Sequence, residues 1–238
     1  YNWQAIFNVQ LVLGALVMFW FWKRQPETLP TSKRTAFRTA VLISGFKEFF
    51  KHKQAIAFTL IAGFITGSFM VYLSTTQHIF EVQYGLGEDF PLIFASLAVG
   101  VGFATYLNGV FVVKIGMKRI ALVSLAAYSL TSLIYVLMFV NQSNPPLWVL
   151  LVFFALQFTA LGFLFGNLRA LAMQPIGHIA GVGAAINGFI STVMGVGIAS
   201  LIGAYVNTTV WPLFLGFTGC GFASMVIFLL NKPLQRTI

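Results

Sequence analysis

Residues 54–76 read QAIAFTLIAGFITGSFMVYLSTT, an apolar run that contains no Asp, Glu, Lys or Arg. A helix of about 20 such residues crosses the ~30 Å hydrocarbon core of a bilayer, so the run predicts a transmembrane helix. The strand of a membrane β-barrel would instead alternate apolar and polar residues over about 10 positions. The stretch therefore favours an α-helical membrane protein.

The rest of the chain repeats this pattern. Of the 238 residues, 58% are hydrophobic and only 8% are charged, and the mean hydropathy is +0.88. A soluble domain carries about a quarter charged residues, so the composition excludes an ordinary soluble enzyme. We expect an all-α polytopic membrane protein with seven transmembrane helices, at residues 3–22, 54–76, 90–113, 120–140, 147–168, 179–206 and 211–231.

The formal net charge of +9 could suggest a nucleic-acid-binding protein, but the positions of the cations argue against one. All 14 Lys and Arg residues follow the first, third, fifth or seventh predicted span, and none follows the second, fourth or sixth. By the positive-inside rule the cationic connections are cytoplasmic. The first residue is then extracytoplasmic and the C-terminus cytoplasmic, and no nucleic-acid partner is expected.

The first connection is the longest of the basic ones. Its apolar residues Phe37, Val41, Leu42, Phe46, Phe49 and Phe50 recur at helical spacing among Lys and Arg. This pattern predicts an amphipathic helix on the inner leaflet, within a basic cytoplasmic loop over residues 23–53. Six closely spaced helices follow at 54–231, then a cytoplasmic tail at 232–238. By count, they divide into two triplets of inverted topology, as in facilitator-type transporters.

Few residues in the spans offer reactive chemistry. No span holds an Asp, Glu, Lys or Arg well inside it, so no intramembrane coupling site is expected here. The three histidines lie at span ends without metal-ligand spacing, and no phosphate-binding glycine loop occurs. Cys220 lies alone inside an apolar run and is interpreted as a packing residue. We therefore predict neither an enzyme nor a bound metal or cofactor.

Neutral polar residues remain as candidates for a binding site. Thr66 and Met70 share a small-residue face of the 54–76 helix, which either lines a cavity or packs closely against another helix. Gln157 lies near the middle of its span beside Phe154 and Phe158. An unpaired amide there is costly, so it should bond either a neighbouring helix or a ligand. The same two interpretations apply to Asn187.

Small residues also predict close helix contacts. Gly162 and Gly166 form a Gly-xxx-Gly pair, for which helix packing is the favoured interpretation. The 179–206 span carries a stripe of small residues at Ala184, Gly188, Ser191, Thr192, Gly195, Ala199 and Gly203. A stripe of this kind lets another backbone approach and rock, and we expect it to face a part of the protein outside this chain.

Residues 166–181, GNLRALAMQPIGHIAG, resemble the helix 10 to 11 region of the Bcr/CflA drug-efflux family of the major facilitator superfamily. Residues 26–30, PETLP, are similar to the start of that family's central loop. A third likeness, to the second copy of the superfamily's cytoplasmic loop motif, is carried by Gly109, Lys114, Gly116, Lys118 and Arg119. Val113 stands where that motif has an acidic residue, so no charge-lock role is inferred for this loop.

The resemblance implies twelve helices, of which this chain supplies helices 6 to 12. Residues 1–22 are then the last helix of the N-terminal half, and 54–231 the C-terminal half. The implied function is proton-coupled multidrug efflux by alternating access in a bacterial inner membrane, with the coupling acids in the missing half. The implied partners are that half, the bilayer, protons and a small apolar or amphipathic drug-like substrate.

For the substrate we expect a mostly apolar pocket to which six residues contribute: Thr66, Met70, Phe154, Gln157, Phe158 and Asn187. A facilitator-type importer of a small metabolite is an alternative, although a polar solute needs more hydrogen-bonding groups than these spans offer. A seven-helix receptor is a second alternative because its topology matches. The long loop after the first span, and the lack of a retinal-type lysine in the last, argue against it.

Overall fold

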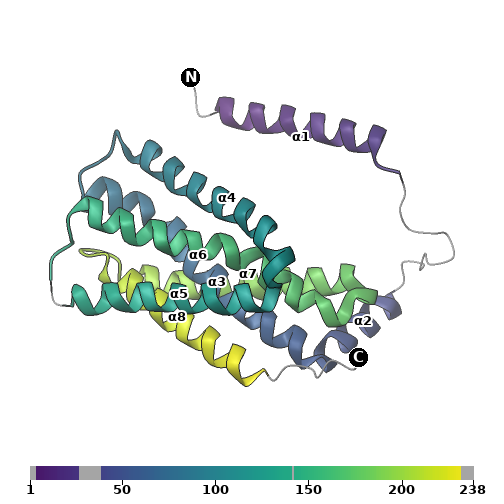
Figure 1. Ribbon diagram of the computed structural model, residues 1–238. Coiled ribbons are helices and arrows are strands. Elements are labelled where there is room, and N and C mark those ends of the chain that lie inside the picture. The colour runs from purple at the N-terminus through teal and green to yellow at the C-terminus, as the bar shows by residue number, and fades with distance from the viewer. Residues whose placement is uncertain (1–3, 27–38, 141, 232–238) are drawn as a thin grey trace. The chain divides into compact units, whose positions relative to one another are not determined.

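The computed structural model describes residues 4–26, 39–140 and 142–231. These residues are helical apart from short connections and contain no strand (Figure 1), which confirms the predicted all-α class. The elements are α1 (Gln4–Arg24), α2 (Thr39–Lys51), α3 (Lys53–Gln77), the π-helix η2 (His78–Gln83), α4 (Phe90–Ile115), α5 (Met117–Met138), α6 (Leu147–Met173), the 3₁₀-helix η3 (Gln174–Ile179), α7 (Ala180–Gly203) and α8 (Trp211–Leu230).

Six helical stretches in the described part of the chain are long and apolar enough to cross a membrane. One of them, Leu147–Gly203, contains α6, η3 and α7, and the backbone leaves helical geometry at Ile176. Since α6 has 27 residues and α7 has 24, each is long enough to cross by itself. The protein is therefore a multi-pass membrane protein, and each predicted span coincides with one of its helices.

The chain divides into two compact units, residues 1–41 and 42–238. In the first unit, α1 is apolar on all sides and none of its residues is buried. A helix of this composition needs lipid or other helices around it. Two parts of the predicted organisation lie outside the described residues. They are the portion of the basic loop that contains Pro30 and Phe37, and the cytoplasmic tail at 232–238.

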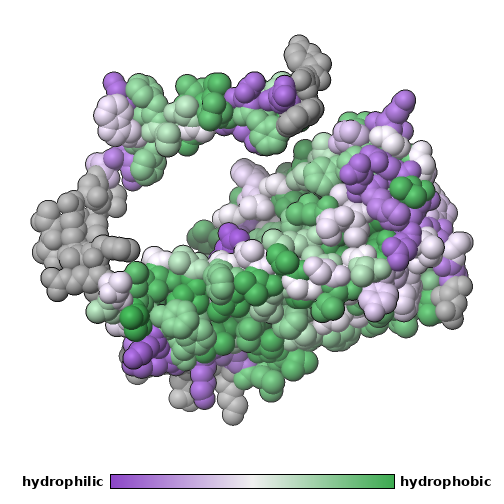
Figure 2. Space-filling view, turned by 180° about the vertical axis from the view of Figure 1, so that it is seen from behind, coloured by the Kyte–Doolittle hydropathy of each residue, from purple (hydrophilic) through white to green (hydrophobic). Residues whose placement is uncertain are grey.

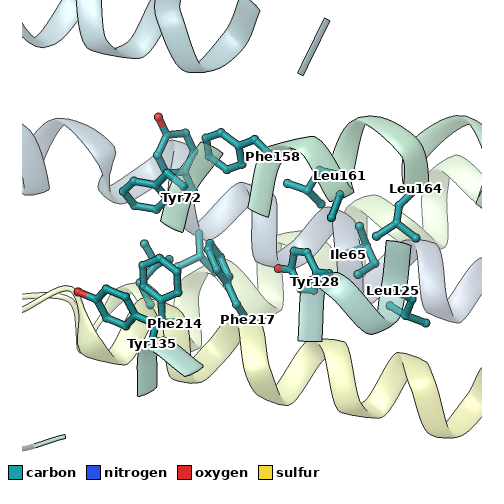
Figure 3. Packing of buried hydrophobic residues seen from close by; sticks show 14 of the residues in the cluster. Ile65, Tyr72, Leu125, Tyr128, Tyr135, Phe158, Leu161, Leu164, Phe214 and Phe217 are labelled. Carbon is teal, nitrogen blue, oxygen red and sulfur yellow. The ribbon is translucent and has the colours of Figure 1, made fainter. Parts of the chain in front are cut away.

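In the second unit, α3 packs against α6, α7 and α8, while α6 also packs against α4 and α5, and α5 packs against α8. The interior is rich in aromatic rings (Figure 3). Tyr135 of α5 stacks on Phe214 of α8 with ring centroids 3.8 Å apart, and Phe214 also stacks on Phe154 of α6 at 5.4 Å. These rings join three helices into one core.

The amphipathic helix α2 contacts the bundle along one edge. Phe49 is fully buried with Ile176 and Ile186, and Gly45 lies against Val182 of α7. Phe46, on another face of α2, stays 52% exposed. The helix thus covers the joint between η3 and α7 and keeps an apolar face free for lipid.

The surface agrees with a membrane setting. In the view of Figure 2, hydrophobic residues cover much of the flank of the bundle, and hydrophilic residues gather toward its ends. Large apolar side chains such as Phe189 (70% exposed) and Leu156 (54%) point outward from the helices. In water such a surface would aggregate, whereas hydrocarbon solvates it.

Candidate substrate site

Helices α3 and α7 meet along a seam of small residues that face long flexible ones. Gly63 of α3 packs against the side chain of Met194, and a Cβ at Gly63 would lie 2.5 Å from the Met194 Sδ atom. Gly195 of α7 packs against the side chain of Met70 in the same way, with a distance of 2.7 Å. Asn187 Nδ2 donates a hydrogen bond to Thr59 Oγ1 at 2.8 Å across the same seam. Because methionine adapts its shape readily, this contact is both close and deformable.

A second cluster, the aromatic cluster, joins α3, α4 and α6. Its members are Phe69, Tyr72, Phe94, Phe154, Phe158 and Phe165. The ring of Tyr72 lies 4.6 Å from that of Phe158, 5.2 Å from that of Phe154 and 6.2 Å from that of Phe94, and Figure 3 shows Tyr72 beside Phe158. Phe69 meets Phe158 at 5.9 Å and Phe165 at 5.6 Å. The cluster forms an apolar wall that is half-buried at Phe69, Phe94 and Phe165.

Several polar atoms inside the bundle have no partner among the described residues. Gln157 is fully buried, and neither its Nε2 nor its Oε1 has a hydrogen bond. The nearby Tyr128 hydroxyl donates to Ser68 Oγ at 2.8 Å, and Gln157 does not reach hydrogen-bond geometry with it. Tyr72 Oη and Thr76 Oγ1 lie near each other without reaching hydrogen-bond geometry, and neither has another partner. Most buried polar groups in proteins are bonded, so these exceptions mark places for water or a ligand.

The six residues that we predicted to bind the substrate therefore fall into two groups. Thr66, Met70 and Asn187 lie in the α3–α7 seam, and Asn187 is already bonded to Thr59. The other three, Phe154, Gln157 and Phe158, are buried in the core around α6. In the described conformation these two groups do not line one open cavity.

Four members of the aromatic cluster were not among the residues predicted from the sequence: Phe69, Tyr72, Phe94 and Phe165. Two of them, Phe69 and Tyr72, lie on α3. Phe69 and Tyr72 both face the α6 aromatics, whereas Thr66 and Met70, on another side of α3, face Gly195 of α7. Their signal was the helical spacing of Phe69, Tyr72 and Thr76, which places an aromatic and polar stripe on one face of the helix.

The predicted packing glycines take different positions. Gly162 lies tightly against α4, whereas a Cβ at Gly166 would be 3.7 Å from Asn108 Nδ2, an ordinary contact. Gly195 and Gly203 face α3, so this part of the small-residue stripe of α7 turns into the bundle. Gly188 is exposed with open space around it. Within the described residues, only the exposed portion of the stripe is free to contact another part of the protein.

The predicted loop motif forms the turn between α4 and α5. Gly116 alone separates the two helices, with φ 87° and ψ 143°, a conformation that is essentially restricted to glycine. Lys114 lies in the last turn of α4, and Lys118 and Arg119 lie in the first turn of α5; all three are exposed. Gly109 lies in α4 with open space around it. The motif thus gathers three cations at one end of the bundle.

Side-chain hydrogen bonds tie together the connections at the opposite end. Asn144 Nδ2 donates to Gln83 Oε1 at 2.9 Å, and the Val210 N–H donates to Asn144 Oδ1 at 2.8 Å. The Asn207 carbonyl accepts from Gln83 Nε2 at 3.3 Å and from His78 Nε2 at 2.7 Å. This network joins η2, the α5–α6 connection and the α7–α8 connection, and so holds the ends of α3, α6 and α8 in register.

The end of α2 carries a small charge cluster. His52 Nε2 lies 3.2 Å from Glu48 Oε1, and Lys51 Nζ lies 3.6 Å from Glu48 Oε2. The hydrogen bond with His52, helped by the charge of Lys51, lowers the pKa of Glu48 below its ordinary value. Within the described residues, no group of three His, Cys, Asp or Glu side chains could hold a metal ion.

Comparison with known proteins agrees with this architecture. A family model described as the Major Facilitator Superfamily matches residues 1–199. The uncharacterized MFS-type transporter YdgK of Bacillus subtilis (strain 168) is 25% identical over 234 residues, which are 97% of this chain and 57% of that protein. A bicyclomycin resistance protein homolog of Haemophilus influenzae is 23% identical over 230 residues, 96% of this chain and 57% of that protein. The chain thus spans little more than half the length of these relatives, and no solved structure matches it.

Proposed function

Because the chain belongs to the Major Facilitator Superfamily, we propose that its α3–α8 bundle forms one half of a transporter that exports drug-like molecules. Family membership points to a transporter of small molecules rather than an enzyme. Drug export is supported by the name of the Haemophilus influenzae relative and by the resemblance of residues 166–181 to the Bcr/CflA family. We place the protein in a bacterial inner membrane, with the α4–α5 turn and the C-terminus in the cytoplasm.

The observation that carries the proposal is the buried amide of Gln157 next to an aromatic wall. A drug-sized apolar ligand needs a mostly apolar surface with one or a few polar groups that fix its orientation. The aromatic cluster supplies the surface, and Gln157 and the Tyr72 hydroxyl supply unpartnered polar atoms. Gln157 is sealed in this conformation, so a substrate reaches it only after the bundle rearranges.

Alternating access supplies that rearrangement. In transporters built from repeats, one bundle rocks against another around a central site. The exposed small residues of α7 around Gly188 offer a smooth surface for such motion, and the Met–Gly contacts of the α3–α7 seam let the two helices adjust. Thr66, Met70 and Asn187 contribute to the site through this adjustment.

Proton coupling is the second part of the proposal. The α-helices α3, α4, α5, α6, α7 and α8 contain no Asp or Glu, so they offer no carboxylate for a proton relay. Glu81 lies in η2, at the end of the bundle, where its carboxylate accepts a hydrogen bond from Gln77 Nε2. We assign the coupling carboxylates to the other half of the transporter. The bundle described here then binds the drug and moves, while the proton site lies elsewhere in the protein.

The substitution Gln157→Leu in the natural full-length protein tests the role of the amide. We expect an altered drug-resistance profile in cells that express it, with thermal stability unchanged or raised because an unpartnered buried amide is removed. Thr159→Val is the matched control. It replaces a polar by an apolar residue on the same helix, at an exposed position where the hydroxyl bonds only the Ala155 carbonyl.

Two results contradict the proposal. Resistance unchanged by Gln157→Leu removes this residue from the site. Loss of resistance together with loss of folded protein makes its role structural. The assay also distinguishes a drug exporter from an importer of a small metabolite, because overexpression of an importer would leave drug susceptibility unchanged.

A further inference from the structure

A crevice opens on the flank of the bundle between the last turn of α4 and the first turns of α5, with α6 as its floor. Its apolar lining comes from Phe111, Ile115, Val123 and Phe163, and the cations Lys114 and Arg119 also border it. Its volume is about 500 Å³. The two helices leave this gap because each packs far more extensively against α6 than against the other.

The two kinds of residue are separated along the crevice. Lys114 and Arg119 lie next to the Gly116 turn, at one end of both helices. Phe111 and Val123 lie about one helical turn deeper, and they are 41% and 62% exposed. A molecule that fills the crevice therefore meets positive charge at the membrane surface and apolar side chains below it.

Among the described residues, no acidic side chain pairs with these cations. The described ion pairs all involve Glu48 of α2, and Lys114 and Arg119 form none. The sequences of α4, α5 and α6, which build the crevice, contain no Asp or Glu. Two cations beside an apolar crevice at a membrane boundary match an anionic lipid headgroup.

We propose that this crevice binds one anionic phospholipid, with its phosphate between Lys114 and Arg119 and an acyl chain along Phe111, Val123 and Phe163. The apolar wall selects a lipid over a free phosphate ion. The neighbouring Lys118 does not line the crevice and takes no part. The inference needs only that the chain spans a membrane, and it holds whichever substrate the transporter carries.

Native mass spectrometry of the purified full-length protein tests this site, with phosphatidylglycerol compared with phosphatidylcholine of the same acyl chains. Lys114→Gln and Arg119→Gln should each lower phosphatidylglycerol binding about fivefold, the loss expected for one cation at an anionic surface. Lys118→Gln is the matched control, because it removes one charge from the same turn and should leave binding unchanged. Val123→Trp should lower binding without any change in charge.

Four outcomes would overturn the proposal. Equal losses from Lys118→Gln and Lys114→Gln would mean diffuse charge attraction. Equal binding of phosphatidylcholine would mean that the headgroup is not recognised. If inorganic phosphate displaces the lipid and Val123→Trp leaves lipid binding unchanged, the crevice is a phosphate site. A wild-type protein that retains no lipid would mean that another part of the transporter covers the crevice.

Discussion

The glycine pair of α6 offers a sharp test of the helix packing, because the same substitution meets two different surroundings. A Cβ at Gly162 would lie 2.6 Å from the Ala104 Cβ and 2.8 Å from the Val101 carbonyl oxygen of α4. Carbon atoms in contact are normally about 3.5–4.0 Å apart, so Gly162→Ala forces α4 and α6 to separate. A Cβ at Gly166 meets only Asn108 Nδ2, at 3.7 Å.

The magnitude follows from two opposing effects. Alanine is favoured over glycine in a helix by about 1 kcal/mol at both positions, and this gain cancels in the comparison. Overpacking at Gly162 costs about 1–3 kcal/mol, because backbone atoms rather than a flexible side chain must move. Gly166→Ala should therefore be more stable than Gly162→Ala by about 2 kcal/mol, or about 4–8 °C in Tm for a chain of this size.

Thiol labelling during heating measures this difference. Cys220 is the one cysteine in the sequence and lies buried in α8, at 6% exposure. A dye that fluoresces on reaction with a thiol reports unfolding of the bundle in detergent, and Cys220→Ser corrects for labelling at other sites. Equal Tm values for the two variants, or a more stable Gly162→Ala, would show that α4 and α6 do not meet at Gly162.

Three further predictions concern the turn, the hydrogen-bond network and the charge cluster. Gly116→Ala should destabilise the protein by about 1–3 kcal/mol through backbone strain alone, while Gly109→Ala in α4 should be neutral or stabilising. Asn144→Leu should lower thermal stability by about 1 kcal/mol per lost hydrogen bond and speed amide exchange in η2. The lowered pKa of Glu48 means that its pairing is present above the ordinary carboxyl pKa and is lost as pH falls through the lowered value. Amide-exchange protection of α2 should therefore fall as the pH drops below about 4.5, the ordinary pKa of the carboxyl group, and Glu48→Gln should remove this dependence.

Each of these has a result that contradicts it. Equal Tm values for Gly116→Ala and Gly109→Ala would mean that the turn is not strained. Gln142→Leu serves as the control for Asn144, and an equal effect on η2 would remove the network. Protection factors of α2 that do not change with pH in the wild type would show that Glu48 does not hold the end of this helix.

The helices were predictable because bilayer thickness sets their length. Each predicted span agrees with a helix to within five residues at either end. The turn at Gly116 was not predicted: the expected spans ended at 113 and resumed at 120, whereas the two helices are separated by one residue. A hydropathy criterion ends a span before cations such as Lys114, Lys118 and Arg119. The helices nevertheless continue through these residues, because long cationic side chains reach from a helix end to the membrane interface.

The sequence singled out residue types that suit a binding site, but it did not show how they are arranged. Gln157 and its aromatic neighbours stood out as costly or bulky residues near the middle of a span. The face of α3 that meets α6 was marked only by the spacing of Phe69, Tyr72 and Thr76, because a membrane helix is apolar on all sides and its weak periodicity does not separate lipid from protein. Thr66 and Met70 consequently lie against α7, and Phe69 and Tyr72 meet the α6 aromatics instead.

Transport in everted membrane vesicles tests the central claim most directly. In vesicles that contain the full-length protein and are acid inside, a fluorescent amphipathic drug should accumulate, and collapse of the pH gradient should release it. Vesicles with equal amounts of the Gln157→Leu protein should accumulate much less, while Thr159→Val should match the wild type. Accumulation that ignores the pH gradient, or that Gln157→Leu leaves intact, would contradict proton-driven drug export through this site.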